Sequence, residues 1–61
     1  MNQAAIGQYI AGKRTAQGIT QAQLAQKIGV SQKSLLRWET GKRLPDAAAV
    51  EALCAALGNT L

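Results

Sequence analysis

The sequence predicts an all-α fold, a compact bundle of four short helices in a single domain spanning residues 1–61. Three observations predict this class. Four glycines, Gly18, Gly29, Gly41 and Gly58, each follow a helical stretch, where a left-handed residue commonly ends a helix. A residue suited to helix capping precedes each stretch, and these starts and stops alternate in order. No segment shows the strict apolar–polar alternation of a strand.

The first helix is expected to begin at an Asn2 cap and to run to about Gln17. Gly7 and Gly12 weaken it, because each costs roughly 1 kcal/mol relative to alanine in a helix. Gly12 either allows a close approach of another helix or only lowers the stability of the first helix. The apolar residues expected on its inner face are Ile6, Tyr9 and Ile10.

The second and third helices have the clearest start signals. Thr20 is expected to cap the second helix, and Gln23 three residues later completes a capping box. Ser31 is expected to cap the third. The apolar residues expected in the core are Leu24, Ala25 and Ile28 on the second helix and Leu35 and Trp38 on the third, with Val30 just before it.

The fourth helix is expected to begin at Asp46, which follows Pro45 and can cap it. Its apolar stripe follows helical spacing and comprises Val50, Leu53, Cys54 and Leu57. We interpret Cys54 as a small buried apolar residue and not as a redox switch.

The composition argues against an enzyme, a metal site and a membrane protein. The chain has no histidine, one cysteine and three carboxylates, so it lacks both a zinc ligand set and a base for a cysteine nucleophile. No cofactor is expected. The longest apolar stretches, 47–50 and 52–57, are far shorter than the ~20 residues that a membrane span needs. No signal peptide is present, so a cytoplasmic location is expected.

The charge is distributed unevenly along the chain. Residues 1–38 carry five basic residues and no acid, a net charge of +5, whereas residues 39–61 carry −1. The isoelectric point is about 9.9. A basic excess of this kind indicates a polyanionic partner, with a solubilising surface charge as the alternative.

Only Gly29, Val30 and Ser31 separate the second helix from the third. A turn this short makes the two helix axes cross steeply, as in a helix-turn-helix, and the third helix can then project into a DNA major groove. Its polar side carries residues whose side chains pair with base edges, namely Gln32, Lys33 and Arg37, with Ser34 beside them.

The segment GITQAQLAQKIGVS (18–31) closely resembles the helix-turn-helix of the phage-repressor/Cro family (Xre type). The continuation QKSLLRWETGK (32–42) and the later pattern from Pro45 to Gly58 also resemble that family. The resemblance implies a lambda-repressor-like bundle and sequence-specific binding of double-stranded DNA by a bacterial or phage transcriptional regulator. A repressor is the favoured form, and the chain is either the regulator itself or the DNA-binding module of a larger one.

The resemblance also implies roles for individual residues. It implies base reading by Gln32, Lys33, Arg37 and Ser34. It implies phosphate contacts by Thr20, Gln21, Lys42 and Arg43, for which capping or a solvated basic loop is the alternative. Arg14 and Glu39 match a pair that forms an internal salt bridge, for which an exposed, weak pair is the alternative.

The sequence departs from the family at two points. The usual fifth helix, which often takes part in dimerisation, is missing after Gly58, so we expect a monomer that pairs weakly as a homodimer on DNA. Leu36 is apolar where a polar residue is common, and it either contacts a thymine methyl group, joins a partner surface or is simply exposed. An antitoxin-like protein-interaction module of the same fold is the alternative function.

Overall fold

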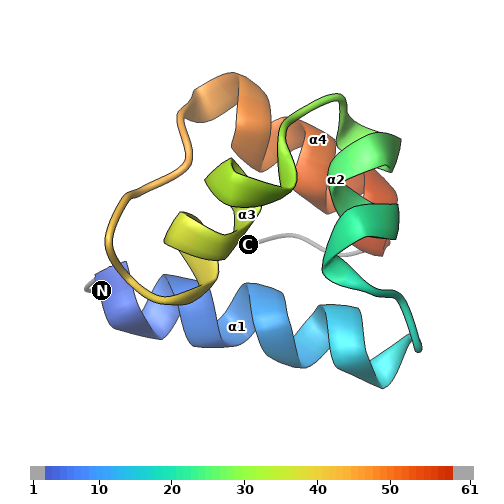
Figure 1. Ribbon diagram of the computed structural model, residues 1–61, viewed down its shortest axis with the longest axis horizontal. Helices are drawn as coiled ribbons and strands as arrows, with labels where there is room; N and C mark the ends of the chain where they lie inside the picture. The colour runs from blue at the N-terminus through green and yellow to red at the C-terminus, as the bar shows by residue number, and fades with distance from the viewer. Residues whose placement is uncertain (1–2, 59–61) are drawn as a thin grey trace.

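The computed structural model describes residues 3–58, and within this range the chain forms four helices and no strand. The helices are α1 (Gln3–Ala16), α2 (Gln21–Ile28), α3 (Gln32–Glu39) and α4 (Ala47–Leu57). Figure 1 shows α1 along one side of the molecule, with α3 next to it and α2 and α4 beyond. α1 packs against α3, and α2 packs against both α3 and α4. The predicted all-α architecture is confirmed.

The caps predicted for α2, α3 and α4 are present. The Thr20 hydroxyl accepts a hydrogen bond from the Gln23 N–H at 3.1 Å, and the Gln23 side chain accepts one from the Thr20 N–H at 2.9 Å. Ser31 and Asp46 each accept from the N–H three residues later, at 3.1 Å and 2.8 Å. Each cap satisfies a helix N–H that has no intrahelical partner, typically worth about 1 kcal/mol. The predicted Asn2 cap lies outside the described residues.

The turn between α2 and α3 depends on Gly29, whose φ of 77° lies in the left-handed region. Its N–H donates to the Gln26 carbonyl at 3.3 Å, and the Val30 N–H donates to the Ala25 carbonyl at 3.0 Å. This pair of bonds is a Schellman motif, which closes the helix and reverses the chain within two residues. Positive φ angles were predicted at four glycines and are observed at all of them: Gly18, Gly29, Gly41 and Gly58.

The core lies where all four helices meet. Its fully buried side chains are Ile10, Leu24, Leu35 and Leu53, one from each helix. Around them the remaining buried apolar residues are Ala25, Trp38, Ala49 and Leu57. The predicted inner residues of α2 and α3 are thus buried or packed against this core.

Two predicted inner faces need correction. Tyr9 is 39% exposed, because α1 turns Ile6 and Ile10 towards the core and leaves Tyr9 at the surface, where Lys13 Nζ lies 5.8 Å from its ring centroid. On α4, Ala49 is buried, whereas Val50 and Cys54 are only partly buried. The buried face of α4 therefore includes Leu53 and Leu57 of the predicted stripe, with Ala49 in place of Val50 and Cys54.

The two glycines of α1 have different surroundings. A Cβ atom on Gly7 would lie 2.6 Å from the Glu39 carbonyl oxygen and would also meet the Trp38 carbonyl oxygen. A Cβ atom on Gly12 would meet nothing within 4 Å. The close helix approach considered for Gly12 therefore occurs at Gly7, where α1 crosses the last turn of α3.

Two further expectations concern the chain beyond this core. None of the helices within residues 3–58 combines the length and the apolar character that crossing a membrane requires. The position of the family's fifth helix falls after Gly58, outside the described residues.

Candidate nucleic-acid interface

α3 presents a polar face to solvent. Its Leu35 and Trp38 side chains are buried against the core, and the Ser31 cap holds its first turn. Residues three and four positions apart share a helix face, so burial of these two directs the opposite face outward. The predicted base-reading residues Gln32, Lys33 and Arg37 are exposed there.

Ser34 lies at the edge of this face. It is partly buried, and its hydroxyl oxygen accepts a hydrogen bond from the Ser31 hydroxyl at 3.0 Å. The Ser34 hydroxyl can still donate, but its position is restricted by the cap. The Ser34 hydroxyl can therefore contact a base from fewer positions than the side chains on the outward face can.

The loop after α3 is held against the end of that helix. The Lys42 and Arg43 N–H groups both donate to the Arg37 carbonyl, at 2.9 Å and 3.2 Å. The preceding Gly41 has a φ of 78° and donates its N–H to the Trp38 carbonyl at 3.2 Å. The exposed side chains of Lys42 and Arg43 therefore extend from backbone that is bonded directly to α3.

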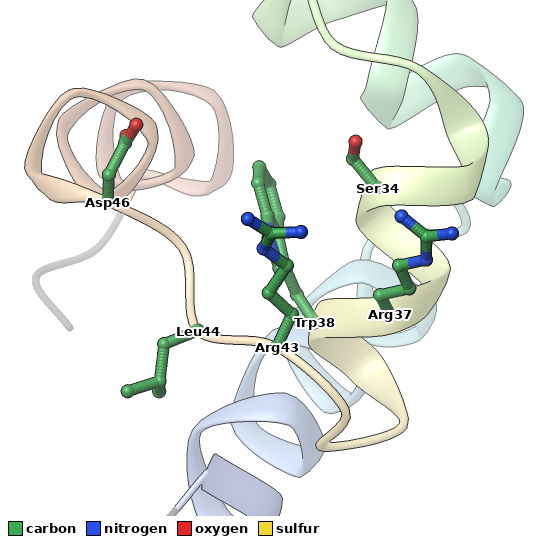
Figure 2. A pocket seen from close by; sticks show the side chains of 6 residues that line it. All are labelled: Ser34, Arg37, Trp38, Arg43, Leu44 and Asp46. Atoms are coloured by element: carbon green, nitrogen blue, oxygen red, sulfur yellow. The ribbon is translucent and has the colours of Figure 1, made fainter.

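These elements enclose a groove of about 420 Å³. Figure 2 shows Arg37 on α3 and Arg43 on the loop extending side by side, with the Trp38 ring between α3 and α4. Sequence reasoning did not place Leu44 and Asp46 at this site. Asp46 was predicted only as a cap, and no local signal shows that the loop brings it to the groove. The groove is lined by Ser34, Arg37, Trp38, Arg43, Leu44 and Asp46.

The start of α2 is bonded to the end of α3, and its polar side chains already have partners inside the protein. The Thr20 hydroxyl is occupied by the capping box. Gln21 is partly buried, and its Nε2 donates to Glu39 Oε1 at 3.0 Å. The first N–H groups of a helix have no intrahelical partner and attract anions, so this terminus retains backbone donors.

Glu39 also joins α3 to α1 through Arg14. Arg14 Nε donates to Glu39 Oε2 at 2.7 Å, and Nη2 donates to Oε1 at 3.1 Å. A third donor, Nη1, reaches the Ile19 carbonyl at 2.8 Å. The Arg14 side chain is only 14% exposed and the Glu39 side chain only 5%. This is the salt bridge that the resemblance implied, and together with Gln21 it sets the start of α2 relative to α3.

The exposed cations of α3 and its loop take part in no ion pair among the described residues. Within residues 3–58 the only ion pair is the one between Arg14 and Glu39. Positive charge therefore gathers on α3 and the following loop, on Lys33, Arg37, Lys42 and Arg43. The outward face of α3 carries side chains that can form hydrogen bonds with base edges, and a basic loop lies next to it. This arrangement suits a DNA major groove and its flanking phosphates.

Comparison with known proteins agrees with this geometry. A helix-turn-helix family model matches residues 10–61. The chain is similar to the clp gene regulator ClgR from Corynebacterium glutamicum, with 28% identity and a TM-score of 0.90 over 95% of this chain and 62% of that one. A second ClgR structure aligns over 95% of this chain and 75% of its own, with 28% identity and a TM-score of 0.87.

The chain is also similar to the restriction-modification controller protein C.AhdI from Aeromonas hydrophila. The two share 28% identity, with a TM-score of 0.89 over 93% of this chain and 86% of that one. None of the curated proteins compared with the chain matches it. In the first of the two ClgR structures, the aligned region covers 62% of the ClgR chain, which is less than two thirds of its length.

Proposed function

This chain belongs to the helix-turn-helix family, of phage-repressor/Cro (Xre) type, and we propose on that premise that it regulates transcription by binding double-stranded DNA. The observation that carries the proposal is the outward face of α3 beside the basic loop at 42–43. The 28% identity to the clp gene regulator ClgR and to the restriction-modification controller protein C.AhdI supports it.

In this function α3 lies in the major groove and reads bases. Arginine and lysine pair with guanine, and glutamine pairs with adenine. The outward face of α3 offers both kinds of side chain in Lys33, Arg37 and Gln32, and Ser34 reaches only bases near the start of the helix. The mechanism is direct readout, in which the fold supplies a rigid helix and the side chains supply specificity.

Phosphate contacts position α3 in the groove. Lys42 and Arg43 contact the backbone on one side, and the start of α2, with Thr20 and Gln21, contacts it on the other. Because Gln21 Nε2 already donates to Glu39, its contact with a phosphate uses the remaining amide hydrogen or the backbone N–H. Thr20 contributes mainly through its cap, which fixes the position of the helix N-terminus. The N–H groups of the first turn that the cap does not use can then bind a phosphate.

Loss of Arg37 should reduce specificity. A duplex is first selected from a random pool, and its affinity is then compared with that of an unrelated duplex. Arg37→Ala is expected to weaken specific binding by about 1–3 kcal/mol and to relax the preference at one base pair. Arg43→Ala, which removes the neighbouring guanidinium, serves as the matched control and should weaken both duplexes alike. An equal loss on both duplexes for Arg37→Ala would contradict base reading by this residue.

Loss of Lys42 should instead change the salt dependence. DNA affinity falls steeply with added salt because cations on the protein release counterions from the phosphates. Lys42→Ala is expected to weaken binding to every duplex and to lower the slope of log affinity against log salt by about one unit. Lys27→Ala, which removes an exposed lysine on α2, should leave the slope unchanged. Absence of duplex binding, with salt-insensitive binding to a protein, would favour the antitoxin-like alternative over the proposed function.

Pairing of two copies on DNA is the further part of this proposal. Two copies would read half-sites about one helical turn apart, roughly 10–10.5 base pairs. The exposed large apolar residues among residues 3–58 are Tyr9, Leu36 and Leu44, which lie on three different elements. They form too little apolar surface for a tight dimer in free solution. Sedimentation of the free protein tests this, and a stable dimer without DNA would contradict it.

The proposed function also implies a cytoplasmic location, because the operators of bacterial and phage regulators lie in the cytoplasm.

A further inference from the structure

We propose that Leu36 is a specificity-determining residue that contacts the C5-methyl group of a thymine in the major groove. This inference rests on the proposed DNA-binding function and adds an apolar determinant to the polar base-reading residues. Leu36 lies within α3 and is 45% exposed, although a leucine at this place gains nothing from contact with water.

Leu36 shares the outward face of α3 with the polar base-reading residues. It follows Gln32 by four positions and Lys33 by three, the two spacings that place side chains on one helix face. Its neighbours on the opposite face, Leu35 and Trp38, are buried. A helix that lies in the groove with Gln32 and Lys33 towards the bases therefore carries Leu36 towards them too.

The backbone around Leu36 is held in place. Its carbonyl accepts hydrogen bonds from the Thr40 N–H at 3.0 Å and from the Thr40 hydroxyl at 2.9 Å. The last turn of α3 is thus closed by two bonds at this residue. Rigid backbone holds the short leucine side chain at one depth relative to Gln32 and Lys33, as base recognition requires.

The chemistry of the groove selects the partner. The major-groove edges of the base pairs display hydrogen-bond donors and acceptors and one apolar group, the C5-methyl of thymine. Leucine has no donor or acceptor, so it gains nothing from a phosphate or from a polar base edge. Beside a thymine methyl it loses water in exchange for apolar contact, and this exchange favours thymine over the other bases.

A surface that binds another protein accounts less well for Leu36. The other exposed large apolar residues, Tyr9 and Leu44, are 39% and 48% exposed and lie on α1 and on the loop before α4. Leu36 is surrounded on its own face by Gln32, Lys33 and Arg37, a polar and basic setting that suits DNA and not an apolar partner.

The test removes one methyl group from the DNA. In the selected duplex, each thymine is replaced in turn by deoxyuridine, which lacks only the C5-methyl. Wild-type protein is expected to lose about fourfold in affinity at one thymine of each half-site, the factor for exposing one methyl-sized group to water. Leu36→Ala should bind the thymine and uracil duplexes equally at that position, and Leu36→Met, which keeps an apolar side chain, should retain the preference.

Tyr9→Ala is the control, because it removes a large exposed apolar side chain on α1, outside the groove and outside α3, and it should keep the wild-type preference. The inference is overturned if no uracil substitution weakens the wild-type protein, a result that does not depend on the folding of any variant. It is also overturned if Leu36→Ala keeps the wild-type ratio. In both cases selective binding of the duplex would leave the proposed function standing, whereas absence of any duplex binding would remove both.

Discussion

Replacing Glu39 by alanine is expected to lower the free energy of unfolding by about 3–5 kcal/mol. The Glu39 carboxylate is 5% exposed and accepts hydrogen bonds from two nitrogens of Arg14 and one of Gln21. Its removal leaves the Arg14 guanidinium, itself only 14% exposed, with the Ile19 carbonyl as its remaining hydrogen-bond acceptor. A domain of this size rarely has more than about 3–5 kcal/mol of stability, so the variant should be largely unfolded at room temperature.

Urea denaturation followed by circular dichroism measures this loss. Glu51→Ala removes an exposed carboxylate from α4 and is the charge-matched control, for which a change of no more than about 0.5 kcal/mol is expected. If Glu39→Ala and Glu51→Ala unfold at the same urea concentration, the Arg14–Glu39 pair contributes no more than an exposed surface pair.

Replacing Gly7 by alanine should have the second large effect. Its new methyl group would lie 2.6 Å from the Glu39 carbonyl oxygen and 2.9 Å from the Glu39 carbonyl carbon. These are backbone atoms of α3 and not the flexible end of a side chain, so α1 and α3 must separate. Overpacking of this kind typically costs about 1–3 kcal/mol, and it opposes the gain in helix propensity that alanine brings.

Gly12→Ala provides the matched substitution in the same helix. Because a Cβ atom there meets nothing within 4 Å, only the gain in helix propensity remains. We expect Gly12→Ala to stabilise the protein by about 0.5–1 kcal/mol, opposite in sign to the effect at Gly7. Thermal melts of the two variants measure both. A Gly7→Ala variant as stable as Gly12→Ala would mean that α1 and α3 do not pack as closely as the structure shows.

Local signals predicted the helices because capping and chain reversal are decided within a few residues. The Thr20–Gln23 box spans three positions, and the Gly29 turn needs only a left-handed residue after the last turn of α2. No distant contact is required for either. The same holds for the outward position of Gln32, Lys33 and Arg37, which follows from helical spacing once Leu35 and Trp38 are buried.

The sequence by itself therefore determined the all-α class, the caps, the left-handed glycines and the polar face of the third helix. Only the tertiary structure decided that Gly7 and not Gly12 is the close-contact glycine, that Tyr9 lies at the surface and Ala49 inside, and that Gln21 pairs with Glu39. It also placed Asp46 in the same groove as Arg37 and Arg43. These features depend on how whole helices rotate and approach one another, and that is settled by the joint packing of side chains far apart in the chain, which no window of a few residues contains.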